Sequence, residues 1–312
     1  MKPEILLTAP VEPRLQADLE AVYRVHRLWE AADKPAFLAA IGKGVRGVVT
    51  RSVIGADEAL MAALPGLEII AVFGVGTDAV DLAAARDRAV RVANTPGVLT
   101  EDTADYGIGL LLALARRIVE GDRYVRAGKW PAGLLANSTR VHGKKLGIVG
   151  LGRIGSAVAR RAQAFGMDIR YNGPRAKPVS AWTHVPDLAA LAAQVDFLIL
   201  TCPGGPQTAG IVNREVLAAL GPEGMLVNIA RASVIDEKAL VTALETGAIK
   251  AAALDVFADE PNVPEALLAM DNVIVEPHIA STTVETRMAI CDLVLANLAA
   301  HFAGRTPPGL VG

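Results

Sequence analysis

The sequence has 312 residues, 52% of them apolar, and a formal net charge of −2. This length exceeds a typical domain of about 100–200 residues, so two domains are expected. The balanced charge, without a basic block, argues against nucleic acid or an anionic membrane as the main partner and favours a small molecule. Two cysteines are too few for a disulfide framework or a metal cage, which predicts no metal site and a reducing, cytoplasmic location.

The sequence also predicts a chain without export or membrane segments. Its N-terminus lacks a basic segment, an apolar signal core and a cleavage site, so no secretion signal is expected. The longest uncharged run, residues 197–213, is interrupted by two prolines and two adjacent glycines, which excludes a spanning helix.

Short apolar runs alternate with helix-like stretches in the first hundred residues, which predicts a parallel sheet with helices on both faces. The expected strands are 5–8, 45–50, 67–73 and 90–94. The alternation breaks near the sequence TPG at 95–97. One long apolar helix is then predicted from about Thr103 to Ala127, ended by Trp130 and Pro131.

From Leu146 the alternation restarts, with enough strands for a second, complete doubly wound sheet. These expected strands are 146–149, 169–172, 197–202, 225–230, 252–257 and 273–276. The last apolar helix, 284–302, has no local strand left to cover, so we expect it to return to the first domain.

The predicted fold class is therefore α/β, with two doubly wound, Rossmann-like domains, parallel sheets and an active-site cleft between them. Residues 1–98 plus 284–312 would form a flavodoxin-like, substrate-binding domain. Residues 99–283 would form a dinucleotide-binding Rossmann domain.

A glycine turn within residues 145–160 joins a short apolar strand to the start of a helix. Gly150 permits the tight turn, Gly152 lets backbone amides approach a pyrophosphate, and Gly155 lets the helix pack closely on its strand. The helix N-terminus then faces the anion. Plain β-turn-α connections also match this pattern, but the flanking strand and the Ala/Val-rich helix predict a dinucleotide site.

Three polar residues come soon after predicted strands at the carboxyl edge of the second sheet, where open parallel sheets bind ligands. They are Arg231, Glu260 and His278. Each has a structural alternative: a capping or surface arginine, an exposed loop carboxylate, and a structurally hydrogen-bonded histidine. Their shared edge beside the glycine turn favours a catalytic set that binds a carboxylate, orients an imidazole and moves a proton.

Six segments together carry a family resemblance. They are 73–78 (FGVGTD), 94–97 (NTPG), 150–155 (GLGRIG), 228–237 (NIARASVIDE), 254–261 (LDVFADEP) and 276–281 (EPHIAS). Their order and spacing closely resemble the D-isomer-specific 2-hydroxyacid dehydrogenases over essentially the whole chain. One departure is Ala232, where the family usually has glycine, and alanine is tolerated there unless a positive φ is needed.

The resemblance implies roles for the polar set. Arg231 would hold the substrate carboxylate and polarise the neighbouring carbonyl. His278 would be the general acid toward the ketone oxygen, and Glu260 would accept a hydrogen bond from it, fix its tautomer and favour its protonated form. Backbone amides of Val75 and Gly76 would bind the substrate carboxylate from the other side of a cleft that closes to exclude water.

The resemblance also implies the contacts of a nicotinamide cofactor. Ile229 and Asp255 would contact the nicotinamide amide, and Thr103 would reach the ring or its ribose. The predicted cofactor-binding residues in full are Thr103, Gly150, Gly152, Arg153, Ile154, Gly155, Asn172, Arg175, Ile229, Arg231 and Asp255.

The end of the second strand predicts which cofactor is preferred. NAD sites usually carry an acid there that binds the ribose hydroxyls, whereas this chain has Asn172. Arg175 and the nearby Lys177 offer positive charge where a 2′-phosphate would lie, so NADP is the predicted preference, with NAD possible. Alternatively, these are solvated loop charges and Asn172 binds a ribose hydroxyl.

Within the family, this strand end resembles the NADPH-dependent glyoxylate/hydroxypyruvate reductases and their hydroxyphenylpyruvate-reducing relatives. The predicted reaction is reduction of a small 2-oxo acid to the D-2-hydroxy acid. The alternatives are another 2-oxo acid reductase, such as a hydroxyphenylpyruvate reductase, or a phosphite-type dehydrogenase, and, more remotely, a non-catalytic, NAD(P)-sensing binding protein. The resemblance also implies a homodimer, in which Trp130 is either an interface aromatic or a residue lining the neighbouring subunit's site.

Overall fold

The computed structural model describes residues 2–178 and 181–311. The chain divides into two compact units, one made of residues up to Leu99 and from Thr282 onward, the other of Thr100–Ser281. The roles assigned to these two parts of the chain stay predictions. Among the described residues, no helix combines the length and apolarity needed to cross a bilayer.

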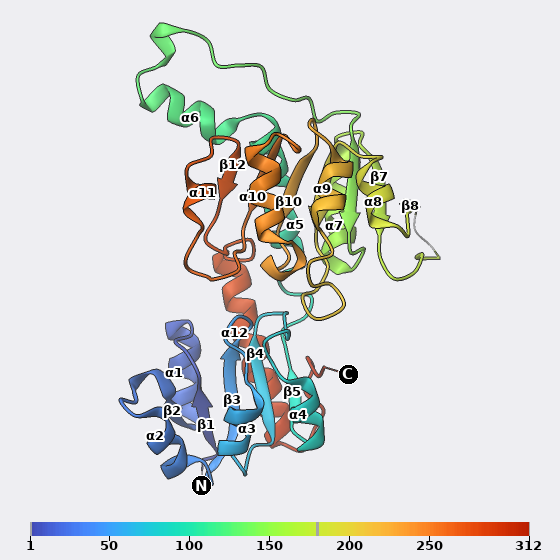
Figure 1. The fold of residues 1–312 in the computed structure, drawn as a ribbon. Helices are drawn as coiled ribbons and strands as arrows, with labels where there is room; N and C mark the ends of the chain where they lie inside the picture. The colour runs from blue at the N-terminus through green and yellow to red at the C-terminus, as the bar shows by residue number, and fades with distance from the viewer. Residues whose placement is uncertain (1, 179–180, 312) are drawn as a thin grey trace. The chain divides into compact units, whose positions relative to one another are not determined.

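The first unit contains a parallel sheet in the order β2-β1-β3-β4-β5 (Figure 1). Its strands are β1 (Glu4–Leu7), β2 (Arg24–Arg27), β3 (Val45–Arg51), β4 (Ile69–Phe73) and β5 (Arg91–Ala93). This is the flavodoxin-type order, which reverses direction between β1 and β3. The sequence did not predict β2 because this edge strand, RVHR, contains one apolar residue and no fully buried one.

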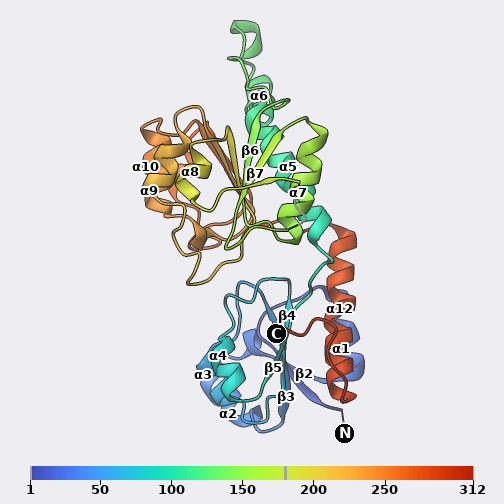
Figure 2. The ribbon, with the colours of Figure 1, turned by 90° about the vertical axis from the view of Figure 1, so that its right-hand side faces the viewer.

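Helices cover both faces of this sheet (Figure 2). They are α1 (Pro13–Val22), α2 (Lys34–Ile41), α3 (Glu58–Ala63), α4 (Leu82–Asp87) and α12 (Val284–Phe302). The C-terminal helix α12 packs against β4 and α1, so a segment from the end of the chain completes the covering of a sheet formed by its beginning.

The second unit contains a seven-stranded parallel sheet in the order β12-β11-β10-β9-β6-β7-β8. Its strands are β6 (Lys145–Val149), β7 (Asp168–Asn172), β8 (Thr183–His184), β9 (Phe197–Leu200), β10 (Met225–Asn228), β11 (Ala251–Leu254) and β12 (Val273–Val275). The sheet reverses direction between β6 and β9, as in dinucleotide-binding folds. The predicted α/β class with two parallel, Rossmann-like sheets is confirmed.

Two buried apolar layers sandwich this second sheet. One lies under α5 (Thr100–Ala115) and α7 (Arg153–Ala164), and the other lies under α8 (Leu188–Ala192), α9 (Arg214–Leu220) and α10 (Glu237–Glu245). The short helix α11 (Glu265–Leu268) contacts β12. Several strands end two or three residues earlier than predicted, because the apolar residues that follow them are buried in turns rather than paired in the sheet.

The predicted continuous helix over 103–127 is wrong. The structure has α5, which ends at Ala115, and a separate α6 (Ile118–Arg126). Arg117 adopts a left-handed conformation with φ 55°, and its side chain pairs with Glu120 in the first turn of α6. No glycine or proline marks this break, so local sequence signals could not predict it.

Candidate active site

The glycine turn after β6 has the geometry that its sequence predicted. Gly150 has φ 95°, and a Cβ at this residue would lie 2.7 Å from the backbone nitrogen of Cys202. A Cβ on Gly155 would lie 2.2 Å from the carbonyl oxygen of Gly150. Around Gly152, its two chain neighbours aside, no atom of the described residues lies within 4 Å of such a Cβ, so the backbone there is open to approach by a ligand.

The helix that follows this turn can receive an anion. It is α7, whose first residue is Arg153 and whose N-cap is Gly152, so no capping side chain covers its first amides. Amides at a helix N-terminus, together with the helix dipole, favour phosphate. Arg153 is exposed, whereas Ile154 is half-buried and packs against the core under α7. These residues therefore fit a dinucleotide pyrophosphate.

The end of β7 carries the residues predicted to choose between cofactors. The side-chain amide nitrogen of Asn172 donates to two backbone carbonyls of the loop after β8, at 3.0 and 2.8 Å. The predicted contact with a ribose hydroxyl would therefore use the side-chain oxygen of Asn172. Arg175 and Lys177 are exposed on the next loop, which is anchored by a 2.7 Å hydrogen bond from the Lys177 amide to the Tyr171 hydroxyl.

Neighbouring strands bring the polar triad to one edge of the sheet. Arg231, Glu260 and His278 follow β10, β11 and β12, which pair in parallel. Nδ1 of His278 lies 2.8 Å from Oε2 of Glu260, and the other oxygen of Glu260 accepts from the Phe257 amide at 3.1 Å. A carboxylate acceptor places a proton on Nδ1, so Nε2 is the ring nitrogen that is left for exchange with a substrate.

The loop that carries His278 is fixed by Asp255, the first residue after β11. The Asp255 carboxylate accepts from the amides of Ile279 and Ala280, at 2.8 and 3.0 Å. His278 itself has φ 56°, a left-handed conformation that needs such support. Burial raises the pKa of Asp255 to about 6, against the two amide hydrogen bonds and the nearby His278, which lower it.

Asn228, the last residue of β10, holds the loop of Arg231 in the same way. It is fully buried; its side-chain oxygen accepts from the Ala230 amide and its nitrogen donates to the Arg231 carbonyl, both at 3.0 Å. The sequence motif included Asn228 but gave it no role; a buried amide at a strand end was the available signal. Ala232 begins a 3-10 turn and is not among the residues with positive φ, so alanine causes no strain there.

A tyrosine and a glutamate near this loop were also not predicted. Tyr106 of α5 donates its hydroxyl to the carboxylate of Glu276, the residue that follows β12. Burial and this carboxylate both raise the pKa of Tyr106. The carbonyl of Glu276 also accepts from the His278 amide at 3.0 Å. Neither residue stood out in the sequence, because their contact joins segments far apart in the chain.

Two predicted cofactor contacts have buried side chains. Ile229 is 6% exposed and packs into the apolar layer against Gly107 of α5. Thr103, also on α5, is 4% exposed. Their contacts with a nicotinamide stay predictions, as does that of Asp255, whose two oxygens are already engaged by backbone amides.

The predicted carboxylate-binding loop lies in the first unit, after β4. The carbonyl of Gly74 accepts from the Thr95 amide at 3.0 Å, and that of Val75 accepts from the Asn94 side chain at 2.7 Å. These two hydrogen bonds restrain the start of the loop. Binding of a carboxylate by the amides of Val75 and Gly76 stays a prediction.

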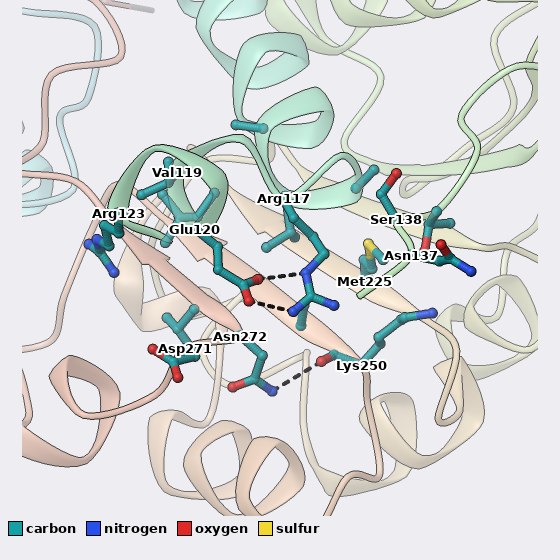
Figure 3. A pocket seen from close by; sticks show the side chains of 17 residues that line it. Arg117, Val119, Glu120, Arg123, Asn137, Ser138, Met225, Lys250, Asp271 and Asn272 are labelled. Carbon is teal, nitrogen blue, oxygen red and sulfur yellow. Dashed lines mark hydrogen bonds and ion pairs between the residues drawn. The ribbon is translucent and has the colours of Figure 1, made fainter. Parts of the chain in front are cut away.

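A cavity of about 200 Å³ in the second unit lies elsewhere (Figure 3). It is lined by the first residues of β10, β11 and β12, at the sheet edge opposite His278, and by the start of α6. Arg117 and Glu120 pair with each other across it at 2.6 Å. No predicted site residue lines it. Within residues 2–178 and 181–311, no three His, Cys, Asp or Glu side chains are grouped to hold a metal.

Comparison with known proteins decides the family. Residues 108–280 match the model of the D-isomer specific 2-hydroxyacid dehydrogenase NAD binding domain. Glyoxylate/hydroxypyruvate reductase A of Arabidopsis thaliana is 46% identical over 302 residues, which cover 97% of this chain and 96% of that protein. The chain belongs to the D-isomer-specific 2-hydroxyacid dehydrogenases.

Two further proteins show comparable similarity over the whole chain. Hydroxyphenylpyruvate reductase of Plectranthus scutellarioides is 46% identical over 301 residues, 96% of each chain. Among solved structures, the NADPH-dependent glyoxylate/hydroxypyruvate reductase of Sinorhizobium meliloti, in complex with NADP and malonate, superposes with a TM-score of 0.94 at 43% identity, covering 100% of this chain and 97% of that one.

Proposed function

We propose that this dehydrogenase reduces a small 2-oxo acid, such as glyoxylate or hydroxypyruvate, to the D-2-hydroxy acid by hydride transfer from NADPH. The observation that carries the proposal is the 2.8 Å contact between His278 and Glu260, at the sheet edge that also bears Arg231 and the glycine turn. The NADPH-dependent relative from Sinorhizobium meliloti supports the same reaction.

The chain's own groups supply binding, orientation and a proton. Bound NADPH would supply the hydride. Arg231 would bind the substrate carboxylate and polarise the ketone. The amides of Val75 and Gly76 would bind the carboxylate as well. His278 would donate a proton to the ketone oxygen, and Glu260, hydrogen-bonded to Nδ1, would stabilise the imidazolium and fix the ring's orientation.

The reaction is tested with a panel of substrates. The purified protein is expected to reduce glyoxylate and hydroxypyruvate with NADPH, followed as the loss of NADPH absorbance. The product from hydroxypyruvate should have the D configuration. Hydroxyphenylpyruvate reductase is the second candidate, favoured by the 46% identity to the Plectranthus enzyme. A higher kcat/KM with hydroxyphenylpyruvate than with glyoxylate or hydroxypyruvate would favour that candidate. Oxidation of phosphite would indicate a phosphite-type dehydrogenase. Cofactor binding without turnover of any substrate would indicate a sensor.

NADP is the proposed cofactor because Arg175 and Lys177 follow β7 on an anchored loop and Asn172 replaces the usual acid. Arg175→Glu is expected to lower kcat/KM for NADPH by about 10- to 100-fold, since a charge-assisted contact to phosphate is lost and a repulsive charge is gained. The value for NADH should change less than about threefold. Arg88→Glu, at an exposed position of the first unit, is the control. Equal loss with both cofactors would contradict the assignment.

We also propose a cytoplasmic homodimer. Ile118 and Val125 of α6, with Trp130 and Leu134 beyond it, are 54–89% exposed, and this segment projects from its sheet (Figure 1). Exposed apolar side chains on one segment favour an interface. Light scattering should give twice the chain mass of 32.5 kDa, and Leu134→Asp should weaken the dimer. A monomer at micromolar concentration would contradict it.

A further inference from the structure

Residues 307–311, which come after α12, lie along the edge strand β5 of the first unit. The Val311 amide donates to the Val92 carbonyl at 2.8 Å, and Leu310 forms an isolated antiparallel bridge with Ala93. These main-chain contacts cover the edge of the sheet and give the 307–311 segment a fixed place beside it.

Three residues of this unit form a closed ring of hydrogen bonds, which we call the Asn94–Asn297–Gly309 ring. The Asn94 amide donates to the Gly309 carbonyl at 2.9 Å, and the Gly309 amide donates to the side-chain oxygen of Asn297 at 2.8 Å. The side-chain nitrogen of Asn297 donates to the Asn94 carbonyl at 2.9 Å. Asn297, on α12, is fully buried. A buried amide with both its polar groups paired specifies one arrangement of the segments that it joins.

The ring accepts only a glycine at residue 309. A Cβ on Gly309 would lie 2.0 Å from the Asn94 carbonyl oxygen and 3.0 and 3.1 Å from the two polar atoms of the Asn297 side chain. A larger residue would therefore push the segment away from the ring. The neighbouring Pro308 is exposed, so a change there leaves the ring intact.

Two hydrogen bonds connect the ring to the loop after β4. The side-chain nitrogen of Asn94 donates to the Val75 carbonyl at 2.7 Å, and the amide of the next residue, Thr95, donates to the Gly74 carbonyl at 3.0 Å. Asn94 therefore bonds the 307–311 segment through its main chain and the loop through its side chain.

These two bonds act on the amides that are predicted to bind the substrate carboxylate. A peptide group is planar, so the Gly74 carbonyl shares its plane with the Val75 amide, and the Val75 carbonyl shares its plane with the Gly76 amide. Both peptide bonds are trans, so in each of them the N–H points away from the carbonyl and from the group that bonds this carbonyl. Holding the two carbonyls therefore fixes the directions of the two N–H groups.

We propose that Asn297 and the 307–311 segment position the loop at residues 74–76, so that the affinity for the 2-oxo acid depends on the Asn94–Asn297–Gly309 ring. This inference rests on the proposed function, in which the loop amides bind the substrate carboxylate, and every contact that carries it lies within the first unit. Because Asn297 is fully buried and acts through Asn94, it is a positioning residue and not a catalytic one.

The first test measures the loop without substrate. Hydrogen exchange at the Thr95 amide reports whether the Gly74 carbonyl keeps its partner. In a chain shortened to end at Thr306, and in Asn297→Ala, this exchange is expected to be about 10-fold or more faster relative to the amides of β4 than in the wild type. Leu19→Ala, which removes a fully buried side chain of α1 and destabilises the same unit elsewhere, is the control and should leave this ratio unchanged.

The second test measures the substrate. Gly309→Ala, Asn297→Ala and the shortened chain should each raise KM for glyoxylate by about 3- to 10-fold, as expected for the loss of about one hydrogen bond, with kcat within about threefold. KM for NADPH should stay unchanged. Pro308→Ala, at the exposed neighbouring position, is the matched control for Gly309→Ala.

A double variant separates the ring from general loss of stability. Asn297→Ala in the shortened chain should raise KM for glyoxylate no further than either change alone, because both changes open the same ring. Two effects on KM that multiply would show that the two parts act independently.

The outcomes distinguish this inference from the proposed function. Exchange at Thr95 that rises no more than at the amides of β4, an unchanged KM for glyoxylate, or independent effects in the double variant would each assign these residues a structural role only. Any of these results would overturn this inference and leave the reductase activity intact. Absence of turnover by the wild type with every 2-oxo acid would instead overturn the proposed function, and this inference with it.

Discussion

The carboxyl edges of the two sheets differ in how completely their buried polar groups are paired. On the seven-stranded sheet, Asn228 and Asp255 stand at strand ends and bond the loops of Arg231 and His278. On the five-stranded sheet, the hydroxyls of Ser52 and Thr95 have no partner among the described residues. The difference indicates that the edge of the seven-stranded sheet is organised to hold its loops in place, whereas the edge of the five-stranded sheet carries buried hydroxyls that add no such support.

At the carboxyl edge of the seven-stranded sheet, removing the imidazole of His278 should have the largest effect on activity. His278→Ala is expected to lower kcat by about 10²- to 10⁴-fold, because the general acid is lost, while the affinity for NADPH stays nearly unchanged. Steady-state kinetics and cofactor titration by fluorescence measure the two effects. His142→Ala, at an exposed position, is the control. Turnover close to that of the wild type would remove His278 from the mechanism.

Removing a strand-end side chain tests whether this edge depends on its hydrogen bonds. Asn228→Ala leaves the Ala230 amide and the Arg231 carbonyl without their partner, so the free energy of unfolding should fall by about 2–4 kcal/mol. KM for the 2-oxo acid should rise as the loop of Arg231 loosens. Denaturant unfolding and kinetics give both values, and Asn137→Ala, at an exposed position, is the control. An unchanged KM would mean that Arg231 keeps its place without Asn228.

The sequence predicted those features of the fold that depend on local pattern. Buried parallel strands appear as apolar runs, and the glycine turn at Gly150–Gly155 has a spacing dictated by its own backbone, so both were found. The edge strand β2 and the short β8 have few apolar residues and were missed. The break at Arg117 was missed because a left-handed arginine stabilised by a side-chain pair leaves no mark in the apolar pattern.

For the candidate site, the residues that follow strands could be selected from sequence, but their supports could not. The contact between Glu260 and His278 was expected from the resemblance and is present, while the catalytic roles stay predictions. The contact of Tyr106 with Glu276 depends on how α5 lies over β12, and the unpaired hydroxyls of Ser52 and Thr95 depend on packing around Gly74. Such contacts are properties of the folded chain alone.

Asp255, at the carboxyl edge of the seven-stranded sheet, makes the stability of the folded chain depend on pH. Its pKa is raised from 3.8 to about 6 in the folded chain, so between these values the folded state binds more protons than the unfolded state. The stability that Asp255 contributes is therefore fully present below about pH 4 and is lost as the pH rises through 6. The Tm of the wild type minus that of Asp255→Asn should decrease from pH 4.5 to pH 7.5. A constant or rising difference would contradict the raised pKa.

The smallest effect is expected at the carboxyl edge of the five-stranded sheet, where two buried threonines of the first unit can be compared. The Thr50 hydroxyl donates to the Gly55 carbonyl at 2.6 Å and accepts from Thr8, whereas the Thr95 hydroxyl has no partner among the described residues. Thr50→Val should lower the free energy of unfolding by about 1–2 kcal/mol, because it leaves that carbonyl unpaired.

Thr95→Val should leave stability unchanged or raise it by up to about 1 kcal/mol, since it replaces an unpaired buried hydroxyl with a methyl group of the same shape. Denaturant unfolding of both variants without substrate measures the contrast. If Thr95→Val costs as much as Thr50→Val, the Thr95 hydroxyl is paired in solution. The two sheet edges would then not differ at this residue.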